Sequence, residues 1–193
     1  MLTPQYAVGV AFMRGDRRLW GDLIVMNATR GPFVHSEFFI QKGEEYRFYT
    51  AANLVHDDSR SRAGGFTPSC RLKARPPAAE WDTVRFPVSE KVYLSTYALI
   101  LQILAMNLPY NDRDLWQCCV KCLLPFEKDL DSNHLATWQP SGVFCSQVCL
   151  LLVRRLMLSD SLVTSPDARL HVLATNSRGC SPNALYRLLT IQG

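Results

Sequence analysis

Residues 140–158 have the sequence PSGVFCSQVCLLLVRRLML, in which a Pro-Ser-Gly turn leads into a long apolar run. Turn residues followed by an apolar segment of this length are typical of a helix that begins just after the turn. We therefore predict a helix over residues 144–158, with Cys145 in its first turn. The unpaired N–H groups and the positive end of the helix dipole favour a thiolate at that position, so Cys145 is a candidate nucleophile.

A second cysteine, Cys149, follows one helical turn after Cys145 and shares its face with Leu152 and Leu156. Because Cys149 lies inside the apolar run, we interpret it as a small buried hydrophobic residue, which is a common role of free cysteine. The same structural role is open to Cys145. Local chemistry alone leaves both interpretations of Cys145 standing.

The second candidate group lies far upstream, in the segment Val34-His35-Ser36-Glu37-Phe38-Phe39. Residues two apart on a strand share a face, so the His35 imidazole and the Glu37 carboxylate are expected to project together. A carboxylate beside an imidazole fixes its tautomer and raises its basicity, which is the orienting role in catalytic triads. The alternative is a half-exposed polar strand face without chemistry.

Length and composition indicate one globular domain over residues 1–193. The chain has a mass of 21.9 kDa, 48% hydrophobic and 20% charged residues. Its net charge of +4 is too mild to indicate nucleic-acid binding, and no nucleic-acid partner is expected. The most basic stretch, residues 60–75, is interpreted as a solvated loop.

Cysteine usage and the N-terminus predict an intracellular protein. The seven cysteines are odd in number and are not spaced like a secreted disulfide framework. The first residues, MLTPQYAVGVAFMRGD, lack the basic start and the cleavage site of a signal peptide. The apolar run at residues 92–109 contains Ser, Thr, Gln and Asn and is too short to span a membrane, so we predict a buried core helix there.

The remaining pattern predicts an α+β fold, in which an antiparallel β-meander or small barrel packs against the helix that carries Cys145. A loop is expected over residues 27–32 and over residues 53–80, a polar loop over 127–142, a turn at 165–167 and a strand-like run at 171–174. The expected strands cover residues 6–12, 33–40, 46–51 and 81–88, and the expected helices cover residues 89–106, 112–123, 144–158 and a segment that begins at Ser181-Pro182.

A candidate metal site lies at Cys118-Cys119-Val120-Lys121-Cys122, where Cys119 and Cys122 form a C-x-x-C pair. Cys180 or His134 could complete four ligands. However, the segment has the pattern of a helix, and no second C-x-x-C accompanies it. We therefore expect neither a metal nor a cofactor. Phosphate-binding glycine loops and serine nucleophile elbows are also absent from the sequence.

Taken in order, these segments resemble the circularly permuted NlpC/P60-like (papain-fold) cysteine enzymes, especially divergent members encoded by large DNA viruses. The resemblance spans about residues 5–190 and depends on the order and spacing of short motifs. The matching segments are Val34-His35-Ser36-Glu37-Phe38, Leu108-Pro109-Tyr110-Asn111, Val143-Phe144-Cys145-Ser146-Gln147 and Cys180-Ser181-Pro182-Asn183-Ala184-Leu185-Tyr186.

The resemblance implies that Cys145 is the nucleophile, His35 the general base and acid, and Glu37 the orienting residue. In ordinary papain-like enzymes the catalytic cysteine precedes the histidine in the chain. Here Cys145 follows His35, and for this reason the arrangement is called permuted. The N–H of Cys145 would be one oxyanion donor, and Ser146 would help the helix to start. The sequence departs from the family at Gln147, where a glutamate is frequent.

The function that the resemblance implies is that of a thiol hydrolase or acyltransferase acting on an amide, thioester or ester through an acyl-enzyme. The family includes peptidases, amidases and lipid acyltransferases, so the substrate is a peptide, an amide or an acyl lipid, and peripheral membrane contact is compatible with it. The expected location is the cytoplasm, including that of an infected host cell, or a virion. The alternative is a non-catalytic scaffold or virion-associated interaction protein with the same fold.

Overall fold

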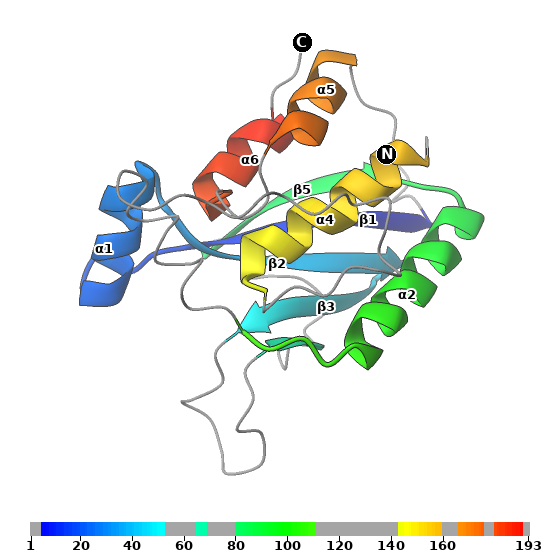
Figure 1. Cartoon of the computed structure of the whole chain (residues 1–193), viewed down its shortest axis with the longest axis horizontal. Coiled ribbons are helices and arrows are strands. Elements are labelled where there is room, and N and C mark those ends of the chain that lie inside the picture. The colour runs from blue at the N-terminus through cyan, green and yellow to red at the C-terminus, as the bar shows by residue number, and fades with distance from the viewer. Residues whose placement is uncertain are drawn as a thin grey trace.

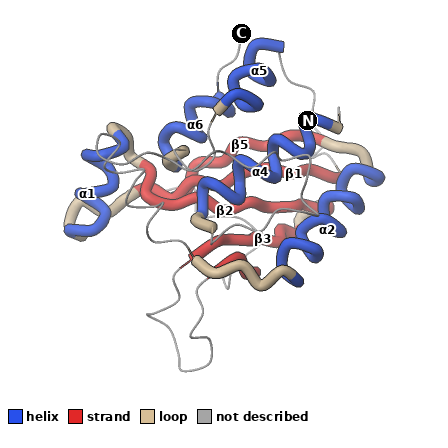
Figure 2. Tube along the Cα trace, viewed as in Figure 1, coloured by secondary structure: helices blue, strands red, loops and turns tan. Residues whose placement is uncertain are grey.

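A computed structural model describes residues 5–52, 65–68, 80–110, 143–159, 166–175 and 180–190. These residues form an antiparallel sheet and a set of helices packed against it, which confirms the predicted α+β class (Figures 1 and 2). The strands are β1 (Tyr6–Arg14), β2 (Phe33–Lys42), β3 (Glu45–Ala52), β4 (Gly65–Pro68) and β5 (Trp81–Pro87). The helices are α1 (Trp20–Thr29), α2 (Glu90–Ala105), α4 (Cys145–Leu158), α5 (Pro166–Ala174) and α6 (Pro182–Thr190).

The sheet has the strand order β4-β3-β2-β1-β5, and every neighbouring pair is antiparallel. β1 to β3 therefore form the predicted meander, with α1 inserted between the first two strands. β4 and β5 stand at the two ends of this order, so the described strands form a sheet with two edges rather than a closed barrel.

The two faces of the sheet bury different sets of side chains. Val8, Val10 and Phe12 of β1 lie in the main core with Phe38 and Ile40 of β2, as the period of two requires. Helices α2, α4, α5 and α6 complete that core. The opposite face carries a smaller cluster of Ala11, Phe39, Phe48 and Trp81.

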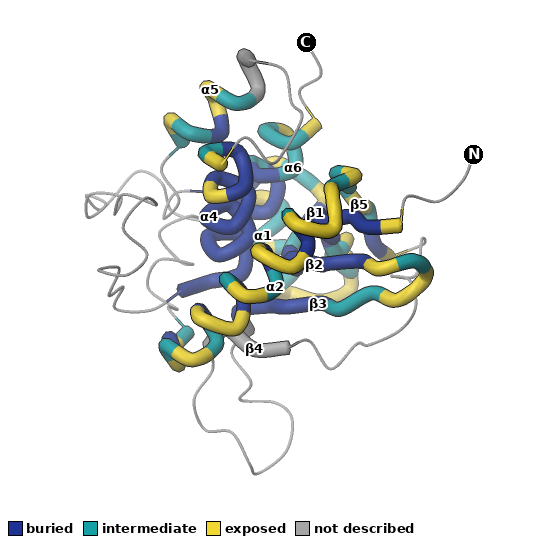
Figure 3. Tube along the Cα trace, turned by 90° about the vertical axis from the view of Figure 1, so that its right-hand side faces the viewer, coloured by how far each residue is buried: buried dark blue, intermediate teal, exposed yellow. Residues whose placement is uncertain are grey.

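Helix α4 lies across the middle of the sheet and is buried along nearly its whole length (Figure 3). It packs over β2 and β3, and it also contacts α5 and α6. Two polar residues join these layers: the Ser146 hydroxyl donates to the Cys180 carbonyl at 2.6 Å, and Arg154 Nε donates to the Val172 carbonyl at 3.0 Å. The helix predicted over residues 144–158 therefore forms, and it is buried in the core of the fold.

Two other predicted helices also form, and each begins at a serine. The helix predicted to be buried over residues 92–109 corresponds to α2, which is buried on one side only, since Leu94 and Leu101 are exposed. Ser89 caps α2, where its Oγ accepts from the Val92 N–H at 3.3 Å. Ser181 caps α6 through a 3.2 Å bond from the Ala184 N–H, and Pro182 occupies the first helical position. No helix in the described ranges has the length and hydropathy needed to cross a bilayer.

Four predictions of secondary structure are wrong. α1 extends through Thr29, into residues predicted as a loop. α5 begins at Pro166, inside the predicted turn, and it also replaces the strand-like run predicted at 171–174. A short strand, β4, lies within the segment predicted as a loop. A short apolar run cannot be assigned to helix or strand by periodicity alone, which explains the error at residues 171–174. The predicted helix at 112–123 and the loop at 127–142 lie outside the described residues.

Candidate active site

Cys145 is the first residue of α4, and the chain that leads to it is held in place on both sides. Val143 pairs with Tyr110 in an isolated parallel bridge, and its N–H donates to the Pro109 carbonyl at 2.8 Å. Phe144 is extended and forms the N-cap without a side-chain cap bond. The Cys145 side chain is 2% exposed. Cys145 therefore lies in the first turn of a helix, as predicted.

His35 and Glu37 lie on β2, and their side chains meet as the strand period predicts. His35 Nε2 is 3.5 Å from Glu37 Oε1, and the two side chains are 21% and 6% exposed. Trp81 of β5 lies beside the ring, edge to face, with 6.4 Å between the ring centroids. The histidine is therefore half-buried against a carboxylate and an aromatic side chain.

The structure brings all three predicted residues together, because α4 packs against β2. The Cys145 thiol is near enough to the His35 ring for a hydrogen bond between them to shift the pKa of each. The contact joins residues 110 positions apart in the chain. The catalytic role of the three residues stays a prediction.

Electrostatics favour a charged pair of Cys145 and His35. Burial on its own would raise the pKa of Cys145, but attraction to the imidazolium and the hydrogen bond to it outweigh burial and lower that pKa. Burial on its own would lower the pKa of His35, but the Cys145 thiolate and then Glu37 raise it above its ordinary value. The favoured form is therefore a thiolate beside an imidazolium.

Ser36 contributes a feature that the sequence analysis did not predict. The ladder between β2 and β3 ends at Phe38 opposite Tyr49, so Ser36 lies where β2 is no longer paired with β3. Its N–H lowers the pKa of Cys145, and its hydroxyl does so to a lesser degree. That hydroxyl is buried and has no hydrogen bond of ordinary geometry within the described residues. Because β2 is not paired with β3 at this position, the Ser36 N–H is available as a donor to the Cys145 thiolate.

Cys149, one turn further along α4, has the opposite behaviour. Burial raises its pKa well above the ordinary value, and the charge of Cys145 raises it further. Cys149 is therefore held as a neutral thiol, in agreement with its interpretation as a buried hydrophobic residue. The contrast arises from position, since only Cys145 lies beside an imidazole.

Thr50 of β3 is a second site residue that the sequence analysis missed. Its Oγ1 lies 2.8 Å from His35 Nε2, closer than the Glu37 carboxylate. The signal that could have found it is the pairing of two predicted strands, residues 33–40 and 46–51, through a short turn. The register of that pairing decides which residue of the second strand faces His35.

Asn183 of α6 fixes the start of β2. Its Oδ1 accepts from the Phe33 N–H at 2.9 Å, and its Nδ2 donates to the Phe33 carbonyl at 2.7 Å and to Thr29 Oγ1 at 2.6 Å. Gly31 lies directly against this amide, and a Cβ there would collide with it. The contacts hold the strand two residues before His35, which gives the late Ser-Pro-Asn segment a structural role.

An Asn183→Ala substitution is therefore expected to lower the free energy of unfolding by about 2 to 4 kcal/mol, because it leaves the buried polar groups of Phe33 without partners. Chemical denaturation followed by circular dichroism measures this. Asn27→Ala on the exposed face of α1 is the matched control and should change stability by no more than about 0.5 kcal/mol. Equal stability of the two variants would contradict this role of Asn183.

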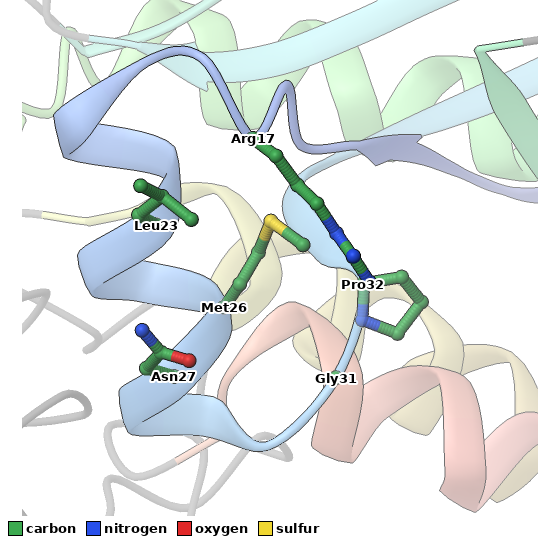
Figure 4. A pocket seen from close by; sticks show the side chains of 6 residues that line it. All are labelled: Arg17, Leu23, Met26, Asn27, Gly31 and Pro32. Atoms are coloured by element: carbon green, nitrogen blue, oxygen red, sulfur yellow. The ribbon is translucent and has the colours of Figure 1, made fainter.

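An open pocket of about 570 Å³ lies beside α1, outside the Cys145 and His35 site (Figure 4). Leu23 and Met26 of α1 line one wall, and Arg17 reaches across from the preceding turn toward Pro32. None of the three candidate residues lines it.

No further histidine joins the site in the part of the chain that the structure describes. No cluster of three or more His, Cys, Asp and Glu is arranged there to hold a metal ion. The Cys119-x-x-Cys122 segment, His56 and His134 lie outside the described residues, and His171 is exposed on α5.

Comparisons of the chain with protein-family models, with curated proteins and with solved structures found no match.

Proposed function

We propose that the protein is a thiol hydrolase or acyltransferase that forms an acyl-enzyme on Cys145. The observation that carries the proposal is the pairing of the Cys145 thiol with the His35 ring, which lowers the pKa of the thiol and raises that of the imidazole. The thiolate is the nucleophilic form of cysteine, and a histidine partner is the usual means of forming it near neutral pH.

In the proposed reaction the Cys145 thiolate attacks the carbonyl carbon of an amide, thioester or ester. The backbone N–H of Cys145, at the start of α4, is one donor to the oxyanion that forms. The His35 imidazolium then protonates the leaving group as the acyl-enzyme forms. Neutral His35 next removes a proton from water or another acceptor, which attacks the acyl group and releases Cys145. Glu37 stabilises the imidazolium between these steps.

The permuted papain-like arrangement is part of the same proposal. Two features support it: a helix that begins at the cysteine packs over an antiparallel sheet, and the histidine strand precedes that helix in the chain. The substrate class follows from the resemblance and covers peptides, other amides and acyl lipids. A non-catalytic scaffold is the competing outcome, and the experiment below separates the two.

The test is labelling by a thiol-reactive acyl probe, resolved by cysteine-containing peptide in mass spectrometry. Cys145 is expected to label at least about 100-fold faster than Cys149 at neutral pH, because Cys149 is held as a neutral thiol. His35→Ala should remove most of that difference. If Cys145 labels no faster than Cys149 and His35→Ala has no effect, the chain is a scaffold.

A further inference from the structure

The His35 ring makes a short contact with Thr50. Thr50 Oγ1 lies 2.8 Å from Nε2, whereas Glu37 Oε1 lies 3.5 Å from the same nitrogen. A separation of 2.8 Å is a good hydrogen bond, and 3.5 Å is long for one. The Thr50 side chain is buried at 7% exposure, so water competes little for the hydroxyl. Of these two partners of Nε2, the nearer one is therefore a neutral hydroxyl, and the Glu37 carboxylate is the more distant one.

The register of the sheet explains how Thr50 reaches the ring. β2 and β3 are last paired at Phe38 opposite Tyr49. The same register continued by one step places Thr50 opposite Glu37, on the face that also carries His35. Thr50 is then the diagonal neighbour of His35, a separation that a long side chain can span. Because Thr is β-branched, its χ1 angle is restricted on a strand and its hydroxyl has a defined direction.

We propose that Thr50 is the positioning residue of His35, whose hydroxyl accepts the Nε2–H proton and directs Nδ1 toward Cys145. The inference rests on the proposed function, since it deepens the role of His35 in that reaction. Glu37, at the longer distance of 3.5 Å, then supports the imidazolium and raises the pKa of His35, while Thr50 sets the orientation of the ring.

The proton balance of the proposed cycle fits this arrangement. The proton that passes between sulfur, leaving group and acceptor is carried on Nδ1, while the proton on Nε2 stays with Thr50 throughout. When His35 is neutral, a proton fixed on Nε2 makes Nδ1 the basic nitrogen. When His35 is charged, the same bond is charge-assisted and strengthens. Thr50 therefore supports both protonation states without itself changing charge.

The experiment compares Thr50→Val, which removes the hydroxyl at nearly constant shape, with Thr50→Ser, which keeps it. The pH dependence of Cys145 alkylation by iodoacetamide is measured peptide by peptide, together with acyl turnover. We expect Thr50→Val to raise the alkylation midpoint by about one pH unit and to slow turnover roughly 10- to 100-fold. Thr50→Ser should restore most of both. Thr83→Val on β5, at an exposed strand position, should change neither.

An unchanged alkylation profile in Thr50→Val overturns the inference. A second measurement uses the wild-type chain, so that a variant that fails to fold does not decide the matter. In ¹⁵N-labelled protein with Cys145 alkylated, neutral His35 is expected to keep its proton on Nε2; a proton on Nδ1 alone overturns the inference. If no acyl substrate is turned over, the proposed function fails, while the alkylation profile and the tautomer still decide the role of Thr50.

Discussion

A Cys145→Ala variant is expected to lose acyl turnover by a factor of about 10⁴ or more, because the covalent route disappears with the sulfur. Cys145→Ser is expected to lose nearly as much, since a serine hydroxyl beside His35 does not ionise as a thiol does. The measurement is kcat/KM on the acyl substrate that labels the protein fastest. Circular dichroism of both variants shows that the loss is chemical and not due to unfolding.

The matched control is Cys149→Ala, on the same face of the same helix. Cys149 is held as a neutral thiol by burial and by the charge of Cys145, so its removal should leave turnover largely intact. A Cys145→Ala variant that keeps its turnover, or a Cys149→Ala variant that alone loses it, would show that the nucleophile has been assigned to the wrong sulfur.

The elements that could be predicted from the sequence are those with strong local signals. β1, β2, β3 and β5 are β-branched and aromatic runs bounded by turns, and α2 and α6 begin at serine caps. α1 could not be predicted, because Gly21 and the neighbouring Ile24 and Val25 weaken its helical signal. In addition, Trp20 and Ile24 of α1 are apolar but exposed, so the pattern of apolar residues does not mark the buried side of this helix.

The three predicted site residues carry local patterns, which explains why each could be identified from the sequence; that they meet follows from the packing of α4 against β2. Cys145 follows a turn at a helix start, and His35 and Glu37 are two apart on a strand. Ser36 and Thr50 carry no such pattern. Their contribution depends on where β2 stops pairing with β3 and on the register of the two strands, which is decided by contacts over the whole sheet.

The separation of β2 from β3 also answers a geometric question that the sequence left open. His35 alternates onto the sheet face away from the main core, whereas α4 packs on the core face with Ser36 and Phe38. A thiol on one face and an imidazole on the other could not meet through a continuous ladder. Where the ladder ends, the Cys145 sulfur reaches both the His35 ring and the Ser36 N–H.

A His35→Ala variant is expected to raise the pKa of Cys145 by about one to three units relative to the wild-type chain. The imidazolium is the main cause that lowers the pKa of this thiol, and its removal leaves burial, which raises it, opposed only by the Ser36 donors. The measurement is the pH dependence of Cys145 alkylation. In the wild-type chain the thiolate forms below the ordinary thiol pKa; in the variant it should form above it.

The same pair also decides how turnover depends on pH. Turnover by the thiolate–imidazolium form should rise as pH passes the lowered pKa of Cys145 and fall as pH passes the raised pKa of His35, so the wild-type profile is a broad bell. Glu37→Gln keeps the shape of the side chain and removes its charge, so it should move the alkaline limb to lower pH and leave Cys145 the faster-labelled thiol. An alkylation midpoint that is the same with and without His35 would mean that the helix start and Ser36 suffice to form the thiolate, and His35 would then have no part in forming the nucleophile.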